Sequence, residues 1–142
     1  MPTGPGPIGF AAFTGVKFLG YSVAASVLTT VFQSPRNAWL VGLARTGIGL
    51  VAGTLFGGIW ILSGTLFHNQ WPAWGAALLF FGLLIPIRLA EWSLLIHFFF
   101  DRGLLQRVRD LKLATVGSAW SFVLDGVGIV SAFVIPGGFW VC

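Results

Sequence analysis

The sequence predicts an all-α integral membrane protein, a bundle of four transmembrane helices with a short amphipathic interfacial helix between the third and the fourth. Two observations predict this fold. Only 8% of the 142 residues are charged, against roughly 25% in an ordinary soluble domain, so a soluble fold would lack a polar surface. The chain also contains apolar stretches long enough to cross about 30 Å of hydrocarbon. We expect residues 1–142 to form a single transmembrane domain.

The first two predicted spans occupy residues 9–33 and 38–67. A Ser-Pro-Arg-Asn sequence separates them, and these residues favour a turn over helix continuation. The second span carries Gly49, Gly53 and Gly57 at intervals of four residues, which places them on one face of a helix. Small residues at this spacing let another helix approach closely. We predict helix packing on this strip, within the chain or against a second copy.

The last two predicted spans occupy residues 71–100 and 114–135. Between them, residues 101–113 place leucine and valine at helical spacing with basic residues in between. This pattern favours an amphipathic helix at the membrane interface, whose basic side chains contact anionic lipid headgroups. The alternative is a third helix that extends out of the membrane. The residues expected to contact headgroups are Arg102, Arg107, Arg109 and Lys112.

Basic residues also predict the orientation of the chain. Four antiparallel spans put Arg36 on the same side of the membrane as the basic segment 101–113. Because short cytoplasmic loops are rich in Lys and Arg, we expect both termini to be non-cytoplasmic. The expected location is a cell membrane, such as a bacterial inner membrane. The net charge of +4 is thereby explained by topology, and we predict no nucleic-acid partner.

Four ionisable residues, Arg45, Arg88, Glu91 and Asp125, fall well inside the predicted spans. A rise of about 1.5 Å per residue puts them roughly 10–18 Å from the cytoplasmic ends, in one layer. Charges at this depth cost about 2.5–3.5 kcal/mol each, so they tend to face the bundle interior and to pair. We expect Arg45 to meet Glu91 and Arg88 to meet Asp125. The pairs either fix helix register or form a polar site for an anionic substrate or protons.

Lys17, in the outer half of the first span, is expected to reach the outer interface with its long side chain. His68 and His97 close opposite ends of adjacent spans, so they do not meet at one metal ion. The one cysteine, Cys142, allows no intramolecular disulfide. The serines lack the sequence context of a hydrolase nucleophile. The sequence therefore predicts no catalytic residue, no metal and no cofactor.

These observations predict a small non-catalytic membrane protein, a subunit or assembly factor of a membrane complex or homo-oligomer. Its expected partners are the lipid bilayer, anionic lipid headgroups and other membrane subunits or copies of itself. The alternative is a small transporter or channel protomer that uses the Arg/Glu/Asp layer for an anionic substrate or protons. A lipid-modifying enzyme is a third possibility, because two arginines and two carboxylates could serve phosphate chemistry, but the spacing matches no known motif.

Overall fold

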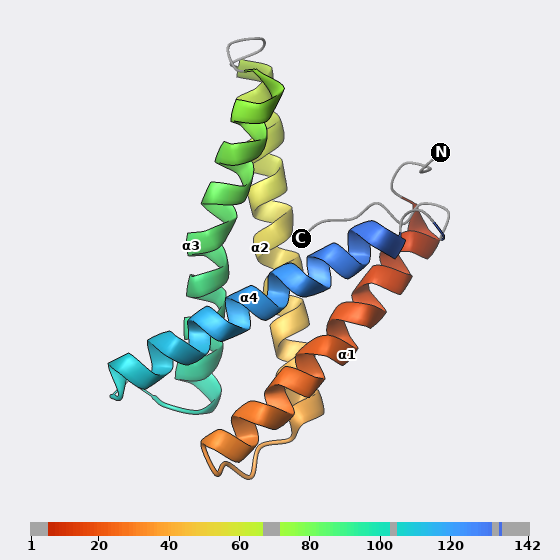
Figure 1. Cartoon of the computed structure of the whole chain (residues 1–142). Helices are drawn as coiled ribbons and strands as arrows, with labels where there is room; N and C mark the ends of the chain where they lie inside the picture. The colour runs from red at the N-terminus through yellow and green to blue at the C-terminus, as the bar shows by residue number, and fades with distance from the viewer. Residues whose placement is uncertain (1–5, 67–71, 103–104, 132–133, 135–142) are drawn as a thin grey trace.

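The structure is a computed structural model that describes residues 6–66, 72–102, 105–131 and 134. The described residues form helices and no strand (Figure 1). Each helix is long and apolar enough to cross a membrane, so the prediction of an all-α fold with four helices of spanning length is confirmed. The helices are α1 (Pro7–Val31), α2 (Ala38–Leu66), α3 (Ala73–Phe99) and α4 (Arg107–Ser131).

The turn between α1 and α2 follows from local backbone chemistry. Gln33 has a positive φ of 48°, and the backbone N–H of Ser34 donates to the carbonyl of Thr29 at 2.9 Å. A residue in the left-handed conformation followed by such a bond is a common way for a helix to end. Asn37 then accepts the backbone N–H of Trp39 on its side-chain oxygen at 2.9 Å. This bond satisfies one of the free N–H groups at the start of α2.

The amphipathic segment differs from the prediction. Residues 107–113 form the first turns of α4 instead of a separate interfacial helix, and α3 ends at Phe99 instead of extending outward. Asp101 organises the connection, because its carboxylate accepts the backbone N–H of Gln106 at 3.3 Å. No proline interrupts residues 107–131, so the helix that starts after this turn continues into the span.

The helices pack in a ring in which each contacts the next along the chain and α4 returns to α1. Figure 1 shows the α1–α2 and α3–α4 connections at the same end of the molecule. The rings of Phe32 and Phe100, one from each connection, stack with centroids 5.1 Å apart. The α2–α3 hairpin extends past α1 and α4 at the other end. No described side chain in residues 51–62 or 74–83 is buried, so the core lies in the half of the hairpin near the connections.

Close helix approaches in this core depend on glycines other than the predicted strip. A Cβ on Gly42 would lie 2.8 Å from the backbone of Ser22 in α1, and a Cβ on Gly117 would lie 2.6 Å from the indole of Trp92 in α3. Gly57, in contrast, has no described atom within 4 Å of a Cβ position. Within the described chain, α2 therefore approaches α1 at Gly42.

Candidate functional site

Five charged side chains from all four helices meet in the core. They are Lys17 of α1, Arg45 of α2, Arg88 and Glu91 of α3, and Asp125 of α4, and none is more than 5% exposed. Burial of isolated charges is strongly unfavourable, so such groups must be paired and hydrogen-bonded. We call this set the charge network.

The charge network is a linear chain in which each carboxylate joins two cations. Asp125 lies 2.6 Å from Lys17 Nζ through Oδ1 and 3.0 Å from Arg88 Nη2 through Oδ2. Oε2 of Glu91 lies 3.2 Å from Arg88 Nη1 and 2.6 Å from Arg45 Nη2. Both pairings expected from the sequence, Arg45 with Glu91 and Arg88 with Asp125, are present. With three cations and two carboxylates, the network carries a formal net charge of +1.

The expectation that Lys17 reaches the outer interface is wrong. Lys17 lies on a buried stripe of α1 that also contains Phe13 and Tyr21, each four residues away. Residues at this spacing share one helix face, and this face points toward α2 and α4. The spacing of these two aromatic residues around Lys17 is the sequence signal that indicated an inward side chain.

Aromatic rings support the two cations at the ends of the network. Lys17 Nζ lies 4.6 Å from the centre of the Phe13 ring. The Arg45 guanidinium lies 4.7 Å from the Tyr21 ring centre and 5.1 Å from that of Trp92. A cation over an aromatic face is stabilised by about 2 kcal/mol when desolvated. The rings thus partly offset the missing second carboxylate at each end.

Ser121 is a polar residue of the site that the sequence did not single out. Its side chain is 0% exposed, and its Oγ accepts the indole N–H of Trp92 at 2.9 Å and Arg45 Nη2 at 3.4 Å. The hydroxyl donates to the carbonyl of Gly117 at 3.2 Å. Ser121 lies one helical turn before Asp125 and therefore on the same face of α4. This spacing from a charged residue is the sequence signal that could have identified it.

Two small cavities adjoin the network, and each measures about 10 Å³. A space of this size admits about one water molecule. The first cavity lies between α1 and α2 and is lined by Phe13, Thr14, Lys17, Tyr21, Thr46, Gly49 and Leu50. The second lies between α2 and α3 and is lined by Ala52, Gly53, Phe56, Leu84, Ile87, Arg88 and Glu91. Two glycines of the predicted strip, Gly49 and Gly53, thus line cavities beside the network.

A larger groove of about 470 Å³ lies on the outside of α2 and α3, and its lining is almost wholly apolar. We call it the α2–α3 groove. Gly47 lies in its wall, where no atom of the described residues comes within 4 Å of a Cβ position, and Ala90 is exposed beside it. The groove is lined by Gly47, Ile48, Val51, Ala52, Leu55, Ile87, Ala90, Glu91 and Leu94.

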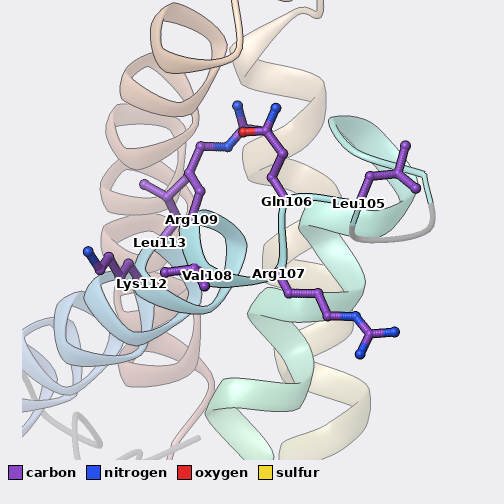
Figure 2. Close-up of a pocket in the computed structure, with 7 residues that line it drawn as sticks. All are labelled: Leu105, Gln106, Arg107, Val108, Arg109, Lys112 and Leu113. Atoms are coloured by element: carbon purple, nitrogen blue, oxygen red, sulfur yellow. The ribbon is translucent and has the colours of Figure 1, made fainter.

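The basic residues predicted to contact lipid lie around the start of α4. Figure 2 shows Arg107, Arg109 and Lys112 leaving the helix in different directions. All three line an open depression of about 790 Å³. Arg109 has partners in the chain: it lies 3.6 Å from Asp101, 3.5 Å from Asp110 and 4.2 Å from the Phe32 ring centre. Arg102, Arg107 and Lys112 are exposed.

Of the two histidines, His97 lies partly buried near the end of α3, and His68 lies outside the described residues, as does Cys142. Within the described parts of the chain, no group of three or more His, Cys, Asp or Glu side chains is arranged to hold a metal ion. No protein-family model, curated protein or solved structure matches this chain. Its function must therefore be inferred from its own geometry.

Proposed function

We propose that the chain is a non-catalytic multi-pass membrane protein that serves as a subunit or assembly factor of a membrane complex or homo-oligomer. The α2–α3 groove carries this proposal. Helices associate in lipid through close packing of small residues, and Gly47 and Ala90 supply such residues at an exposed apolar surface. A transmembrane helix of another subunit, or of a second copy, fits this surface.

The charge network supports a structural role over a transport role. Both carboxylates are engaged by two cations each, and the adjoining cavities hold no more than about one water molecule each. A transporter for an organic anion needs a larger polar space at its binding site. Paired buried charges that join four helices instead specify helix register and orientation.

The orientation we propose follows from the shared end of the two connections. Arg36, Arg102, Arg107 and Lys112 are exposed at that end, which we assign to the cytoplasm because short basic loops are retained there. The start of α4 then lies at the inner interface, where its basic residues contact anionic headgroups. A reporter active only outside the cytoplasm should function when fused after Cys142, and a cytoplasmic reporter there should not.

Purification from the native membrane in mild detergent tests the proposed association. We expect the wild-type protein to migrate as a homo-oligomer or with other membrane polypeptides, measured by native mass spectrometry. Gly47→Leu should fill the groove and release the monomer, because the leucine side chain occupies the space a partner needs. No atom in the described part of the chain obstructs its Cβ.

Gly15→Leu is the matched control. Gly15 is an exposed glycine of α1 with equally open space around a Cβ position, and it lies outside the α2–α3 groove. This variant should retain the wild-type assembly. A wild-type protein that purifies alone as a monomer would contradict the proposed function.

A further inference from the structure

Within the described chain, the buried carboxyl of Asp110 at the start of α4 has no hydrogen-bond donor. The residue is 3% exposed, and both of its side-chain oxygens are buried without a hydrogen-bond partner. Arg109 Nε lies 3.5 Å from Asp110 Oδ1, but this N–H is also without a hydrogen-bond partner, so the contact is an ion pair alone. Buried ionised carboxylates are normally hydrogen-bonded. The surroundings of Asp110 therefore do little to stabilise its ionised form.

A second carboxyl lies against Asp110. Asp101 Oδ2 is 3.6 Å from Arg109 Nη2, so both carboxyls contact the same guanidinium. The Asp101 carboxyl is also within hydrogen-bonding range of Asp110, and its charge opposes ionisation of Asp110. If both were ionised, two carboxylates and one guanidinium would carry a formal net charge of −1, and neither carboxylate could donate a hydrogen bond to the other. Neighbouring carboxyls in such an arrangement favour sharing one proton.

The partners of each carboxyl decide which one carries this proton. Asp101 Oδ2 accepts the backbone N–H of Gln106 at 3.3 Å, and hydrogen bonds of this kind stabilise the ionised form. The Asp110 side chain has no such bond and is the more buried of the two, at 3% exposed against 12% for Asp101. We propose that Asp110 carries a proton and donates it to Asp101, so that one hydrogen bond joins α4 to the α3–α4 connection. We call Asp101 and Asp110 the carboxyl pair.

The charge of the carboxyl pair is set by few neighbours. Among the described residues, the charged groups that act on Asp110 are Asp101 of the connection and Arg109 of its own helix. The α1–α2 connection contributes the uncharged ring of Phe32, whose centre lies 4.2 Å from the Arg109 guanidinium. One proton therefore balances the single positive charge of Arg109 against the single negative charge of Asp101.

Loss of this proton turns the hydrogen bond into a repulsion. As the pH rises, the O–H bond of Asp110 breaks, its electron pair stays on the carboxylate, and the proton leaves to water past the partly exposed Asp101. In the unfolded chain an aspartate has a pKa of about 3.9, so it has already released its proton at mildly acidic pH. The folded state then binds more protons than the unfolded state, and the stability that the carboxyl pair contributes falls as the pH rises.

The consequence is a pH-sensitive attachment of the start of α4. This segment carries the exposed basic residues Arg107 and Lys112, and the connection holds it less firmly once Asp110 is ionised. The inference concerns contacts within one chain, so it does not depend on the proposed association with other subunits.

Asp110→Asn tests the carboxyl pair, because an asparagine keeps a hydrogen-bond donor for Asp101 and cannot ionise. Tm of the detergent-solubilised protein is followed by circular dichroism from mildly acidic to alkaline pH. We expect the variant to match the wild type at the acidic end and to have the higher Tm at the alkaline end. Comparison at each pH removes the titration of the other carboxyls, which both proteins share. A difference in Tm that stays constant or moves against the variant as the pH rises would overturn the inference.

Asp110→Ala separates the hydrogen bond from the relief of repulsion. Alanine removes the charge and the donor together, so this variant should have a lower Tm than Asp110→Asn at the acidic end. Equal Tm values of the two variants there would show that no hydrogen bond to Asp101 is made.

Infrared spectroscopy detects the proton without reference to stability. A protonated carboxylic acid has a C=O stretching band that a carboxylate lacks. At mildly acidic pH, the wild type should show this band and Asp110→Asn should lack its contribution, and the wild-type band should disappear as the pH rises. Identical bands in the two proteins would show that Asp110 is ionised and would refute the shared proton.

Discussion

Lys17 and Asp125, on the first and last helices, form an ion pair with 2.6 Å between Nζ and Oδ1. The pair lies where α1 and α4 meet, which is the least extensive of the contacts between neighbouring helices. One further bond joins these helices, from the indole N–H of Trp120 to the carbonyl of Gly20 at 2.9 Å. These polar contacts close the ring of four helices together with the packing of Leu124 against Gly20, and the stability of the fold should depend on them.

Asp125→Asn should destabilise the fold far more than Lys17→Met. The asparagine leaves both Lys17 and Arg88 without their carboxylate, and removing one partner of a buried pair costs about 3–5 kcal/mol. The methionine leaves Asp125 bonded to Arg88 and brings the remaining network to zero net charge. We expect Lys17→Met to lower the free energy of unfolding by less than half as much as Asp125→Asn.

Thermal or denaturant unfolding of the two variants in the same detergent measures this difference in stability. Equal losses in the two variants would show that the network does not act through its charge balance.

Sequence reasoning identified four of the five charges because depth along a helix follows from residue counting. Arg45, Arg88, Glu91 and Asp125 fall in one layer by rise alone, and opposite charges in one layer of a bundle pair. Lys17 was misplaced because its partner depends on the rotation of α1 about its axis. The aromatic residues one turn away on each side of Lys17 indicate which face of α1 is buried. The depth of a residue along the helix does not give this rotation.

The predicted glycine strip shows a second limit of pattern reasoning. The spacing of four residues indicates that Gly49, Gly53 and Gly57 share one helix face. It does not indicate which helix packs against that face. Within the described chain, the close approaches are at Gly42 and Gly117, and these depend on where α1 and α3 cross their neighbours. Packing of the strip against a second copy stays a prediction. Likewise, the start of α4 at Arg107 depends on the turn made by Asp101, a tertiary feature without a sequence period.

Gly42→Ala should therefore destabilise the protein, whereas Gly57→Ala should not. An alanine Cβ at position 42 meets the backbone of Ser22, and overpacking of this kind costs about 1–3 kcal/mol. At position 57 the Cβ enters open space, and the higher helix propensity of alanine should be neutral or favourable by up to about 1 kcal/mol. The unfolding midpoints of the two variants test this difference in stability. A larger loss for Gly57→Ala than for Gly42→Ala would contradict the prediction and would show that the Gly49, Gly53 and Gly57 strip makes the closer helix contact.

Ser121→Ala should cost about 1–3 kcal/mol, because it leaves the buried Trp92 indole N–H without an acceptor. The bond from Arg45 to Ser121 is lost as well. Ser26→Ala is the control, since the exposed Ser26 hydroxyl donates only to the Ser22 carbonyl on its own helix. A shift in the fluorescence of Trp92 should accompany the loss of stability, and equal stability of the two variants would contradict the assigned role of Ser121.

At the start of α4, Arg107 and Lys112 should act on lipid while Arg109 acts on the fold. The first two are exposed and point apart (Figure 2), which suits a surface of many headgroups better than one phosphate. Each basic residue near an anionic surface contributes about 1 kcal/mol. The double variant Arg107→Ala/Lys112→Ala should therefore weaken phosphatidylglycerol binding at least tenfold, with unchanged Tm.

Arg109→Ala provides the contrast within the same helix turn. Arg109 is engaged by Asp101 and by the Phe32 ring, so its loss should lower stability by at most about 1 kcal/mol, given its partial exposure, and alter lipid binding little. Lipid binding is measured by titrating fluorescent phosphatidylglycerol into the detergent-solubilised protein, with phosphatidylcholine as the uncharged reference. If the double variant binds phosphatidylglycerol as tightly as wild type, the start of α4 does not lie against the headgroups, and the orientation proposed for the chain loses its lipid support.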